Sequence, residues 1–266
     1  MDDRIRLEVV DGVAEVRLAR AAKRNALDQP MFAALRAAAA ALKTRAGVRA
    51  VVLSGEGEAF CAGLDRGEFA RMAGGGPDLE QLLGGARSAR GANAPQQAVL
   101  GWRELPVPVI AAVHGVAFGG GLQLMLGADL RLVAPDARLS IMEIHWGLVP
   151  DMGGIALLRR LVRDDVAREL TYTGRVFDGN EALQLGLATR VCADPRAAAL
   201  ALARTLAQQP PRALRAAKRL FELAADDDAA AILQAESREQ AALIGAAEQV
   251  EAVRARLEGR APRFDD

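Results

Sequence analysis

Hydrophobic and polar residues alternate or cluster in two short runs near the start of the chain, residues 5–10 and 13–18. Asp11-Gly12 separates the two runs, and this dipeptide favours the tight turn of a β-hairpin. Residues 50–54 and 109–113 are almost entirely apolar, which is typical of strands that are buried on both faces. The pattern therefore predicts a hairpin followed by interior strands.

A helix is predicted between the hairpin and the first of these buried strands. Asp28 is a suitable N-cap for a helix over residues 29–44, which has a proline in its first turn. Residues 130–133 form a third short apolar run, and the alternation of strands with helices indicates an α/β core. Glycines and prolines interrupt residues 71–91 and 143–154, so we expect a loop with some helix in the first stretch and no single regular helix in the second.

The last third of the chain has a different character. Pro195 opens a nearly all-helical region that is rich in Ala, Leu, Arg and Glu. Pro210-Pro211 begins a further helix, and residues 229–257 continue the helical pattern. We therefore divide the chain into a core of residues 1–194 and a helical C-terminal region of residues 195–266.

Composition and charge narrow the range of functions. Hydrophobic residues make up 51% of the 266 residues, which is enough for a sizeable core. The 34 basic residues balance the 34 acidic residues, so no global charge attracts nucleic acid or an anionic membrane. Two cysteines do not make a disulfide framework, and two histidines without a CxxC motif argue against zinc. With no signal peptide or membrane-spanning run in view, we expect a soluble, cytoplasmic protein.

Three consecutive glycines, Gly119–Gly121, begin an apolar helix soon after the run at residues 109–113. Glycines at a helix N-terminus leave N–H groups free, and the helix dipole there stabilises negative charge on a phosphate or an oxyanion. Neither a Walker loop nor the dinucleotide fingerprint is present, so phosphate binding of those two kinds is not expected. Tight packing between strand and helix explains the same glycines equally well.

The whole segment resembles the signature of the crotonase superfamily, also called the enoyl-CoA hydratase/isomerase family. The matching positions are Ile110–Val113, His114, Gly115, Gly119–Gly121, Leu126, Ala128 and Asp129. Three further segments are similar to other parts of that family, so the resemblance covers essentially the whole chain. They read AAKRNALD, AFCAGLD and GRVFDGNEALQLGLATRV.

This resemblance implies a fold, a substrate class and an assembly. The expected fold is α/β, the crotonase spiral of stacked ββα units followed by a helical C-terminal region. The expected substrate is an acyl-CoA thioester, and no metal or bound redox cofactor is implied. The expected assembly is a homotrimer or a dimer of trimers, in which residues 195–266 provide subunit contacts and cover the active site. Many relatives hold adenine with an aromatic residue and a lysine near the C-terminus, but Arg256 and Gly259 occupy those places here.

The resemblance also implies roles for individual residues. The backbone N–H groups of Leu64 and Gly120 would form an oxyanion hole, in which two donors stabilise the enolate that forms when the α-proton leaves. The predicted substrate-binding residues are Lys23, Arg24, Ala26, Ala62, Gly63, Asp65, Gly119 and Gln123, of which Asp65 is more simply explained as a brace for its loop. Cys61 is predicted to be a small wall residue and His114 a turn residue. His145 and Trp146 either line the pocket or fill the core.

Glu143 and Asp151 are the candidate catalytic acids. Typical hydratases of the family carry one glutamate at the position of Gln123 and another at that of Glu143, so one of their two acids is missing here. Glutamine orients a water but exchanges no proton at neutral pH. The Glu143 and Asp151 pair resembles the dienoyl-CoA isomerase branch, which usually has an aspartate at position 123 as well. Without a catalytic role, Asp151 would be a loop acid or a helix cap, and Glu143 would be a solvated charge at the end of a strand.

We therefore expect a double-bond isomerase that acts on an enoyl- or dienoyl-CoA, with Glu143 and Asp151 as the acid/base pair. Two alternatives remain open. One is an enoyl-CoA hydratase that uses Glu143 alone while Gln123 holds the water. The other is an acyl-CoA-binding protein without catalysis.

Overall fold

The predicted hairpin forms one edge of the main sheet in the computed structural model, which describes residues 3–74, 83–85, 87–225 and 227–264. Within these residues, six strands pair in the order β1 (Ile5–Val10), β2 (Val13–Leu18), β3 (Ala50–Gly55), β4 (Val109–Val113), β6 (Leu130–Val133) and β8 (Arg190–Val191). The hairpin is antiparallel and every later pairing is parallel. A second, two-stranded parallel sheet consists of β5 (Val116–Phe118) and β7 (Arg138–Ser140). The two hairpin strands and the three apolar runs predicted from the sequence are all strands.

Helices connect and cover these strands. The first part of the chain contains η1 (Ala21–Lys23), α1 (Gln29–Lys43), α2 (Arg66–Ala73), α4 (Ala94–Arg103), α5 (Gly120–Leu126) and η2 (Glu143–Trp146), where η marks a 3₁₀ helix. The rest contains α6 (Gly154–Leu158), α7 (Asp164–Thr173), α8 (Gly179–Leu185), α9 (Pro195–Ala207), α10 (Pro211–Ala224), α11 (Ala229–Leu243) and α12 (Ala247–Glu258). The Asp28 carboxylate caps α1 by accepting from the Met31 N–H, as predicted. None of the helices in these described ranges has both the length and the apolar character needed to cross a bilayer.

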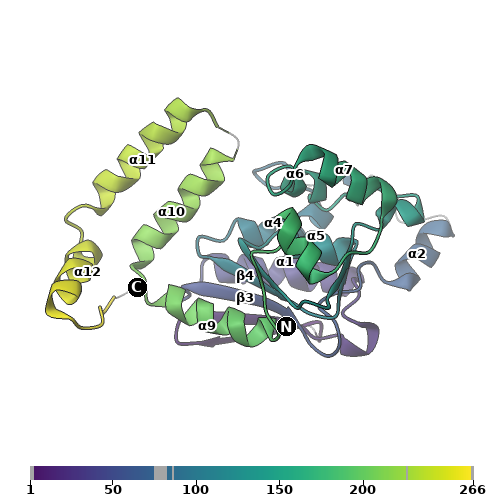
Figure 1. The fold of residues 1–266 in the computed structure, drawn as a ribbon, viewed down its shortest axis with the longest axis horizontal. Coiled ribbons are helices and arrows are strands. Elements are labelled where there is room, and N and C mark those ends of the chain that lie inside the picture. The colour runs from purple at the N-terminus through teal and green to yellow at the C-terminus, as the bar shows by residue number, and fades with distance from the viewer. Residues whose placement is uncertain (1–2, 75–82, 86, 226, 265–266) are drawn as a thin grey trace.

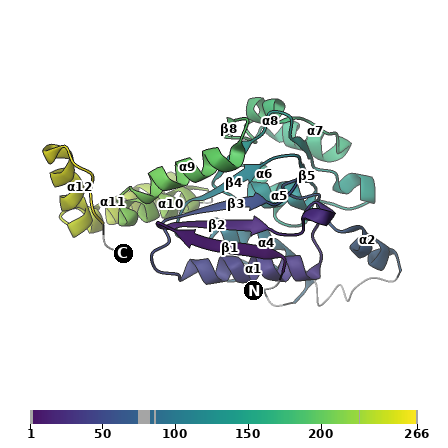
Figure 2. The ribbon, with the colours of Figure 1, turned by 90° about the horizontal axis from the view of Figure 1, so that it is seen from below.

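Both faces of the main sheet are covered by helices. Val51 and Leu53 of β3 belong to the apolar cluster that includes α1, whereas Val52 belongs to the cluster that includes Ala199 and Ala203 of α9. Figure 2 shows α1 and α9 on opposite sides of the strands. The helix α9 therefore packs as part of the core, past the boundary predicted at residue 194.

The helices α10, α11 and α12 form an arm that extends to one side of this core, at the end of the molecule opposite α2 (Figure 1). A buried contact anchors them, because the Lys218 ammonium lies 2.7 Å from Asp129 Oδ2 and donates to the Val107 carbonyl at 2.8 Å. The same Asp129 oxygen accepts from the Val109 N–H at 2.7 Å. The aspartate at the end of the glycine-rich signature thus joins the arm to the start of β4.

Short elements were not predicted from the sequence. The strand β5 lies between the end of β4 and Gly119, where only a turn was expected, because three residues are too few to show a period. Residues 229–257 are broken into two helices around Gly245, which has a φ of +76°. Residues 143–154 hold a 3₁₀ turn and then the start of α6, as expected for a stretch without one regular helix. Of the predicted loop at 71–91, residues 75–82 and 86 lie outside the described residues.

Candidate active site

The residues predicted from the sequence for the site all line one cavity of about 770 Å³. They reach it from four segments that are far apart in the sequence: the η1 turn, the loop before α2, the start of α5, and the stretch around η2. Its predicted members are Lys23, Arg24, Ala26, Ala62, Gly63, Leu64, Asp65, Gly119, Gly120, Gln123, Glu143 and Asp151. The fold therefore brings the predicted acids, amides and cations to a single space.

The Leu64 amide is oriented by a short parallel bridge to Leu27. The Leu27 N–H donates to the Gly63 carbonyl at 2.8 Å, and the Asp65 N–H donates to the Leu27 carbonyl at 2.9 Å. Because neighbouring N–H groups of an extended strand point to opposite sides, these bonds turn the Leu64 N–H away from Leu27. Among the described residues this N–H has no acceptor.

The Gly120 amide opens α5, so it has no acceptor within the helix, and none of the other described residues accepts from it. It lies close to the loop that carries Leu64. A Cβ atom placed on Gly63 would lie 3.7 Å from the Gly120 nitrogen and 2.5 Å from the Phe118 carbonyl oxygen. Gly63 itself has a φ of +84°. Two unpaired amides thus belong to adjoining stretches of backbone on the cavity wall.

Each glycine of the triplet has a different close neighbour. A Cβ atom on Gly119 would lie 3.4 Å from Glu143 Oε1, and one on Gly120 would lie 2.9 Å from the Met152 sulfur. On Gly121 it would lie 2.3 Å from the Cys61 carbonyl oxygen, which a real Cβ cannot approach. Close packing therefore explains Gly121, and the approach to Glu143 and the cavity explains Gly119 and Gly120.

A buried amide holds the Glu143 side chain. Gln123 Nε2 donates to Glu143 Oε1 at 2.6 Å, while Gln123 Oε1 accepts from the Met152 N–H at 2.8 Å and the Gly154 N–H at 3.0 Å. The two backbone donors fix which end of the amide is oxygen. Glu143 Oε2 is buried with no hydrogen-bond partner among the described residues. One oxygen of the Glu143 carboxyl group is therefore fixed by a hydrogen bond, and the other has no donor among the described residues.

Burial raises the pKa of Glu143, and the nearby Asp151 carboxylate raises it further, while the hydrogen bond from Gln123 acts in the opposite direction. Partial desolvation by the cavity wall also raises the pKa of Asp151, although the residue as a whole is exposed. Glu143 is only 9% exposed, so it is not a solvated strand-end charge. Asp151 is not the cap of α6 either, because Gly153 holds that position.

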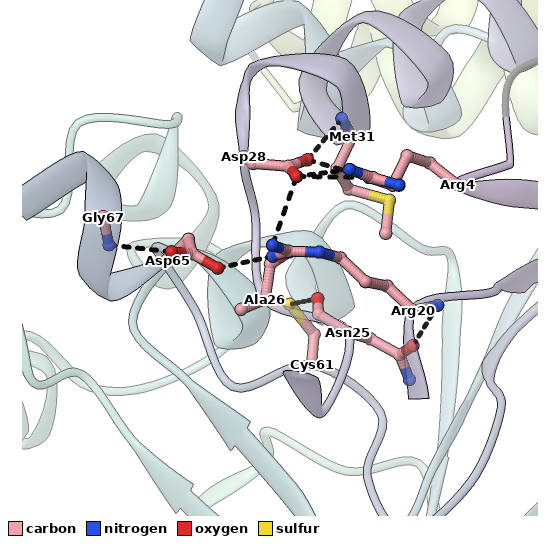
Figure 3. A network of polar contacts seen from close by, with 9 residues as sticks. All are labelled: Arg4, Arg20, Asn25, Ala26, Asp28, Met31, Cys61, Asp65 and Gly67. Atoms are coloured by element: carbon pink, nitrogen blue, oxygen red, sulfur yellow. Dashed lines mark hydrogen bonds and ion pairs between the residues drawn. The ribbon is translucent and has the colours of Figure 1, made fainter. Parts of the chain in front are cut away.

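An ion-pair network fixes the loops on which Ala26 and Leu64 lie (Figure 3). Arg20 Nη1 donates to Asp65 Oδ2 at 2.5 Å and to the Ala26 carbonyl at 3.1 Å. Arg20 also lies 3.4 Å from Asp28, which is paired with Arg4 at 2.9 Å. The Gly67 N–H and the Arg20 guanidinium lower the pKa of Asp65. Asp65 therefore lines the cavity as a brace of its loop.

Asn25 stabilises the bend between η1 and α1. It is fully buried with a φ of +55°, and its Nδ2 donates to the carbonyls of Glu56 and Ala59 at 2.9 and 2.8 Å. Its own carbonyl accepts from the Cys61 thiol at 3.1 Å. Cys61 lies behind the cavity lining, which corrects the expectation of a wall residue, because its side chain is directed toward Asn25. Burial raises the pKa of this thiol to about 12.

Three exposed cationic residues line the cavity near η1 and the start of α2. Lys23 ends η1, and Arg24 follows it in a left-handed conformation with a φ of +48°. Arg66 begins α2 and also lines the cavity. None of the three forms an ion pair with a described residue. Exposed, unpaired cations of this kind can bind the phosphates of a polyanion.

The cavity has an aromatic wall, of which the sequence named Trp146 as a candidate lining residue but did not single out Phe69. Phe69 of α2 stacks on Trp146 of η2, with ring centroids 4.2 Å apart and planes 19° apart. Trp146 is 53% exposed, so it lines the cavity and does not fill the core. His145 instead contacts the Thr173 carbonyl, and His114 contacts the Gly57 carbonyl as a turn residue. Phe69 has no recognisable signal, because it lies in a polar segment of irregular pattern.

The cavity lining of the described chain runs from Ala22 to Met152 and includes no residue of the C-terminal region. Within one subunit, the described residues of the C-terminal region therefore do not line this cavity. The predicted cover, and any adenine contact from Arg256 or Gly259, would have to come from a second subunit.

Comparison with known proteins agrees with this geometry. Residues 8–266 match the enoyl-CoA hydratase/isomerase family. The chain is 32% identical over 262 residues to mouse mitochondrial methylglutaconyl-CoA hydratase, covering 95% of this chain and 79% of that protein. Enoyl-CoA hydratase from Bacillus anthracis superposes with a TM-score of 0.88 at 30% identity, covering 98% of both chains. The enzyme from Mycobacterium smegmatis gives a TM-score of 0.86 at 31% identity, again over 98% of each chain. This chain is therefore a crotonase-fold enzyme of the enoyl-CoA hydratase/isomerase family.

Proposed function

We propose that this chain moves a double bond along an enoyl- or dienoyl-CoA, with Glu143 and Asp151 exchanging the protons. The observation that carries this proposal is that both carboxyl groups line the cavity onto which the unpaired amides of Leu64 and Gly120 open. A cavity with two acids and an oxyanion hole has the parts that a proton shift beside a thioester requires.

The first step removes a proton from the carbon next to the thioester carbonyl. The Glu143 carboxylate takes this proton through Oε2, the oxygen without a protein partner. The C–H electron pair becomes the carbon–carbon double bond of an enolate, and the negative charge moves to the thioester oxygen. The Leu64 and Gly120 N–H groups stabilise that oxygen, and one such donor is worth about 3 kcal/mol.

The second step returns a proton farther along the acyl chain. Electrons flow back from the enolate through the conjugated system, and the distal carbon takes a proton from Asp151 in its acid form. Burial raises the pKa of Asp151 and of Glu143, which brings both closer to neutral pH and eases the exchange of protonation states. A conjugated 2-enoyl or 2,4-dienoyl thioester results.

Hydration is the second candidate, because the relatives compared above are named hydratases. Against it stands Gln123, whose oxygen already accepts from two backbone amides and whose nitrogen already donates to Glu143. Its remaining N–H can hold a water but cannot give it a proton. A purely binding role is disfavoured, because the unpartnered Glu143 oxygen costs stability without benefit in a mere carrier.

The CoA moiety would enter past the η1 turn. Lys23 and Arg24 would meet its phosphates, while Ala26 and Ala62 would contact the pantetheine or adenine end. The reaction transfers only protons, so the proposal needs no metal or bound redox cofactor. These assignments rest on the resemblance and on the exposed cations at the rim.

A homotrimer or a dimer of trimers is also part of the proposal. The arm carries exposed apolar side chains, among them Phe221 at 76% and Leu257 at 83% exposure, as is typical of a surface that a second subunit covers. Size-exclusion chromatography with light scattering gives the assembly directly, and a monomer at micromolar concentration would contradict this part.

Ultraviolet absorbance and mass spectrometry on purified enzyme test the reaction. A 3-enoyl-CoA or 3,5-dienoyl-CoA should gain the absorbance of a conjugated thioester without a change of mass. Addition of water to a 2-enoyl-CoA, without any isomerisation, would replace the isomerase assignment by hydration. Glu143→Gln and Asp151→Asn should each lower kcat about 100-fold or more at similar affinity for CoA. Asp136→Asn, in an exposed turn outside the cavity, is the matched control.

A further inference from the structure

Gln123 links Glu143 to the turn that follows Asp151. Its nitrogen holds Glu143 Oε1 at 2.6 Å, and its oxygen holds the Met152 and Gly154 amides at 2.8 and 3.0 Å. The backbone it holds is the turn directly after Asp151. One side chain thus connects the Glu143 carboxyl group with the segment that places Asp151 on the cavity wall.

We propose that Gln123 is a positioning residue, which aims the free oxygen of Glu143 into the cavity and keeps the 151–154 turn at a fixed distance from it. Three of its four hydrogen-bonding sites are used by these contacts, and the residue is only 1% exposed. Bulk water therefore does not compete for the contacts. This proposal rests on Glu143 acting as the base, but it does not depend on where the proton is returned.

The three hydrogen bonds of Gln123 act as a clamp on Glu143, and no other contact in the described residues can replace it. Glu143 Oε2 has no partner, so Oε1 is the only oxygen of this carboxyl group that a described side chain holds. Gly119 packs against the same carboxyl group, since a Cβ there would lie 3.4 Å from Oε1, but it has no side chain to hold it. Without Gln123, the Glu143 side chain could rotate, and a shift of about 1 Å in a reacting group can cost about 100-fold in rate.

The clamp also acts on protonation in a predictable direction. The N–H of Gln123 stabilises the ionised form of Glu143 and so lowers its pKa against the effect of burial. Loss of that donor should raise the Glu143 pKa. Because a base must be ionised to accept a proton, the acidic limb of the pH–rate profile should then move to higher pH.

Deuterium exchange tests the role without requiring isomerisation. Wild-type enzyme is incubated with butyryl-CoA in D₂O, and mass spectrometry follows deuterium entering the carbon next to the carbonyl, a reaction that needs only Glu143 and the two amides. In Gln123→Met the exchange rate should fall about 100-fold, with similar KM and the acidic limb moved upward. Gln184→Met, at an exposed site on α8, is the matched control and should behave as wild type.

Two further variants separate positioning from loss of folding. Gln123→Glu keeps an acceptor for the Met152 and Gly154 amides, so its melting temperature should exceed that of Gln123→Met, while its acidic limb also moves upward. The double variant Gln123→Met with Glu143→Gln should be no slower than Glu143→Gln alone, because the amide acts through the carboxyl group. Additive losses in the double variant, or an unmoved pH limb in both single variants, would overturn the proposal. Exchange without isomerisation in wild type would refute the proposed function alone, and absence of exchange would refute both.

Discussion

Arg20 Nη1 lies 2.5 Å from Asp65 Oδ2, so one ion pair links the end of β2 to the loop that carries the Leu64 amide. The side chains of Arg20 and Asp65 are 19% and 17% exposed, so water screens this pair less than a surface pair. The same carboxylate accepts from the Gly67 N–H and caps α2. Asp65 therefore fixes the loop that carries the Leu64 amide, through Arg20 on one side and the start of α2 on the other.

We expect Asp65→Asn to weaken this loop without abolishing the site. Loss of a charged, part-buried hydrogen bond should lower the free energy of unfolding by about 1–3 kcal/mol. The KM for acyl-CoA should rise, because the Leu64 amide is less well held. Thermal unfolding and initial-rate kinetics check both effects, with Asp136→Asn as the control. An unchanged KM would show that the loop keeps its place without the ion pair.

Much of the site could be predicted because its parts have local sequence signals. The glycine triplet, the spacing from Gln123 to Glu143 and the Leu64 loop each belong to a contiguous motif. The role of Arg20 could not be predicted, since its contacts to Asp65 and Asp28 span 45 and 8 residues along the chain. Phe69 and its stacking on Trp146 were missed for the same reason, because the two rings meet only in the folded chain.

The fold shows the same division between local and distant information. The hairpin was predicted with its boundaries and α1 to within one residue, because a turn dipeptide joins the two strands and a capping residue begins the helix. The placement of α9 against β3, and of α10 beside Asp129 through Lys218, follows from packing between distant segments. Periodicity within one segment has no information on such contacts, which is why the core extends past the predicted boundary.

Replacing Glu143 by glutamine should change stability in a pH-dependent way. Burial raises the pKa of Glu143 in the folded chain above its ordinary value of 4.5. Between 4.5 and this raised pKa, the glutamate of the unfolded chain is ionised while that of the folded chain still holds its proton. Stability of the wild type therefore falls as pH rises through this window, and Glu143→Gln removes that loss. The melting temperature of the variant relative to wild type should be higher at pH 8 than at pH 4. Glu8→Gln, on the exposed side of β1, controls for the lost charge, and an equal difference at both pH values would contradict the expectation.

A methyl group at Gly121 should disturb the packing behind the oxyanion hole. A Cβ there would lie 2.3 Å from the Cys61 carbonyl oxygen, so the backbone has to move. We expect Gly121→Ala to cost about 1–3 kcal/mol in unfolding free energy and to lower kcat. Gly101→Ala, in α4, is the control, because outside its own helix the added Cβ would meet only the Ala39 side chain of α1, at 3.4 Å. There the gain in helix propensity should stabilise the chain by up to about 1 kcal/mol. Equal melting temperatures for the two variants would show that Gly121 tolerates a side chain.

The Trp146 ring should contribute to binding of the acyl chain and not to the chemical step. Its stack on Phe69 forms a flat apolar wall, and such a pair is worth about 0.5–1.5 kcal/mol beyond its buried area. In Trp146→Ala, KM for a longer acyl-CoA should rise up to about tenfold, which corresponds to about 1.4 kcal/mol. KM for a two- or four-carbon acyl-CoA should change little, and so should kcat. A uniform rise in KM for all chain lengths would place the ring near the CoA moiety instead.

The amide at position 123 should also decide whether water adds to the substrate. Gln123→Glu has nearly the same shape, and its oxygen can still accept from the Met152 and Gly154 amides. Its other oxygen would face Glu143 Oε1 at the position now held by Nε2, 2.6 Å away, where two ionised carboxylates repel each other. The pair should therefore share one proton, which supplies an acid and a base side by side. We expect the ratio of hydration to isomerisation to rise in this variant, measured from the 3-hydroxyacyl-CoA and conjugated products of one reaction. If the ratio stays at the wild-type value, the amide at position 123 is not what keeps water from adding.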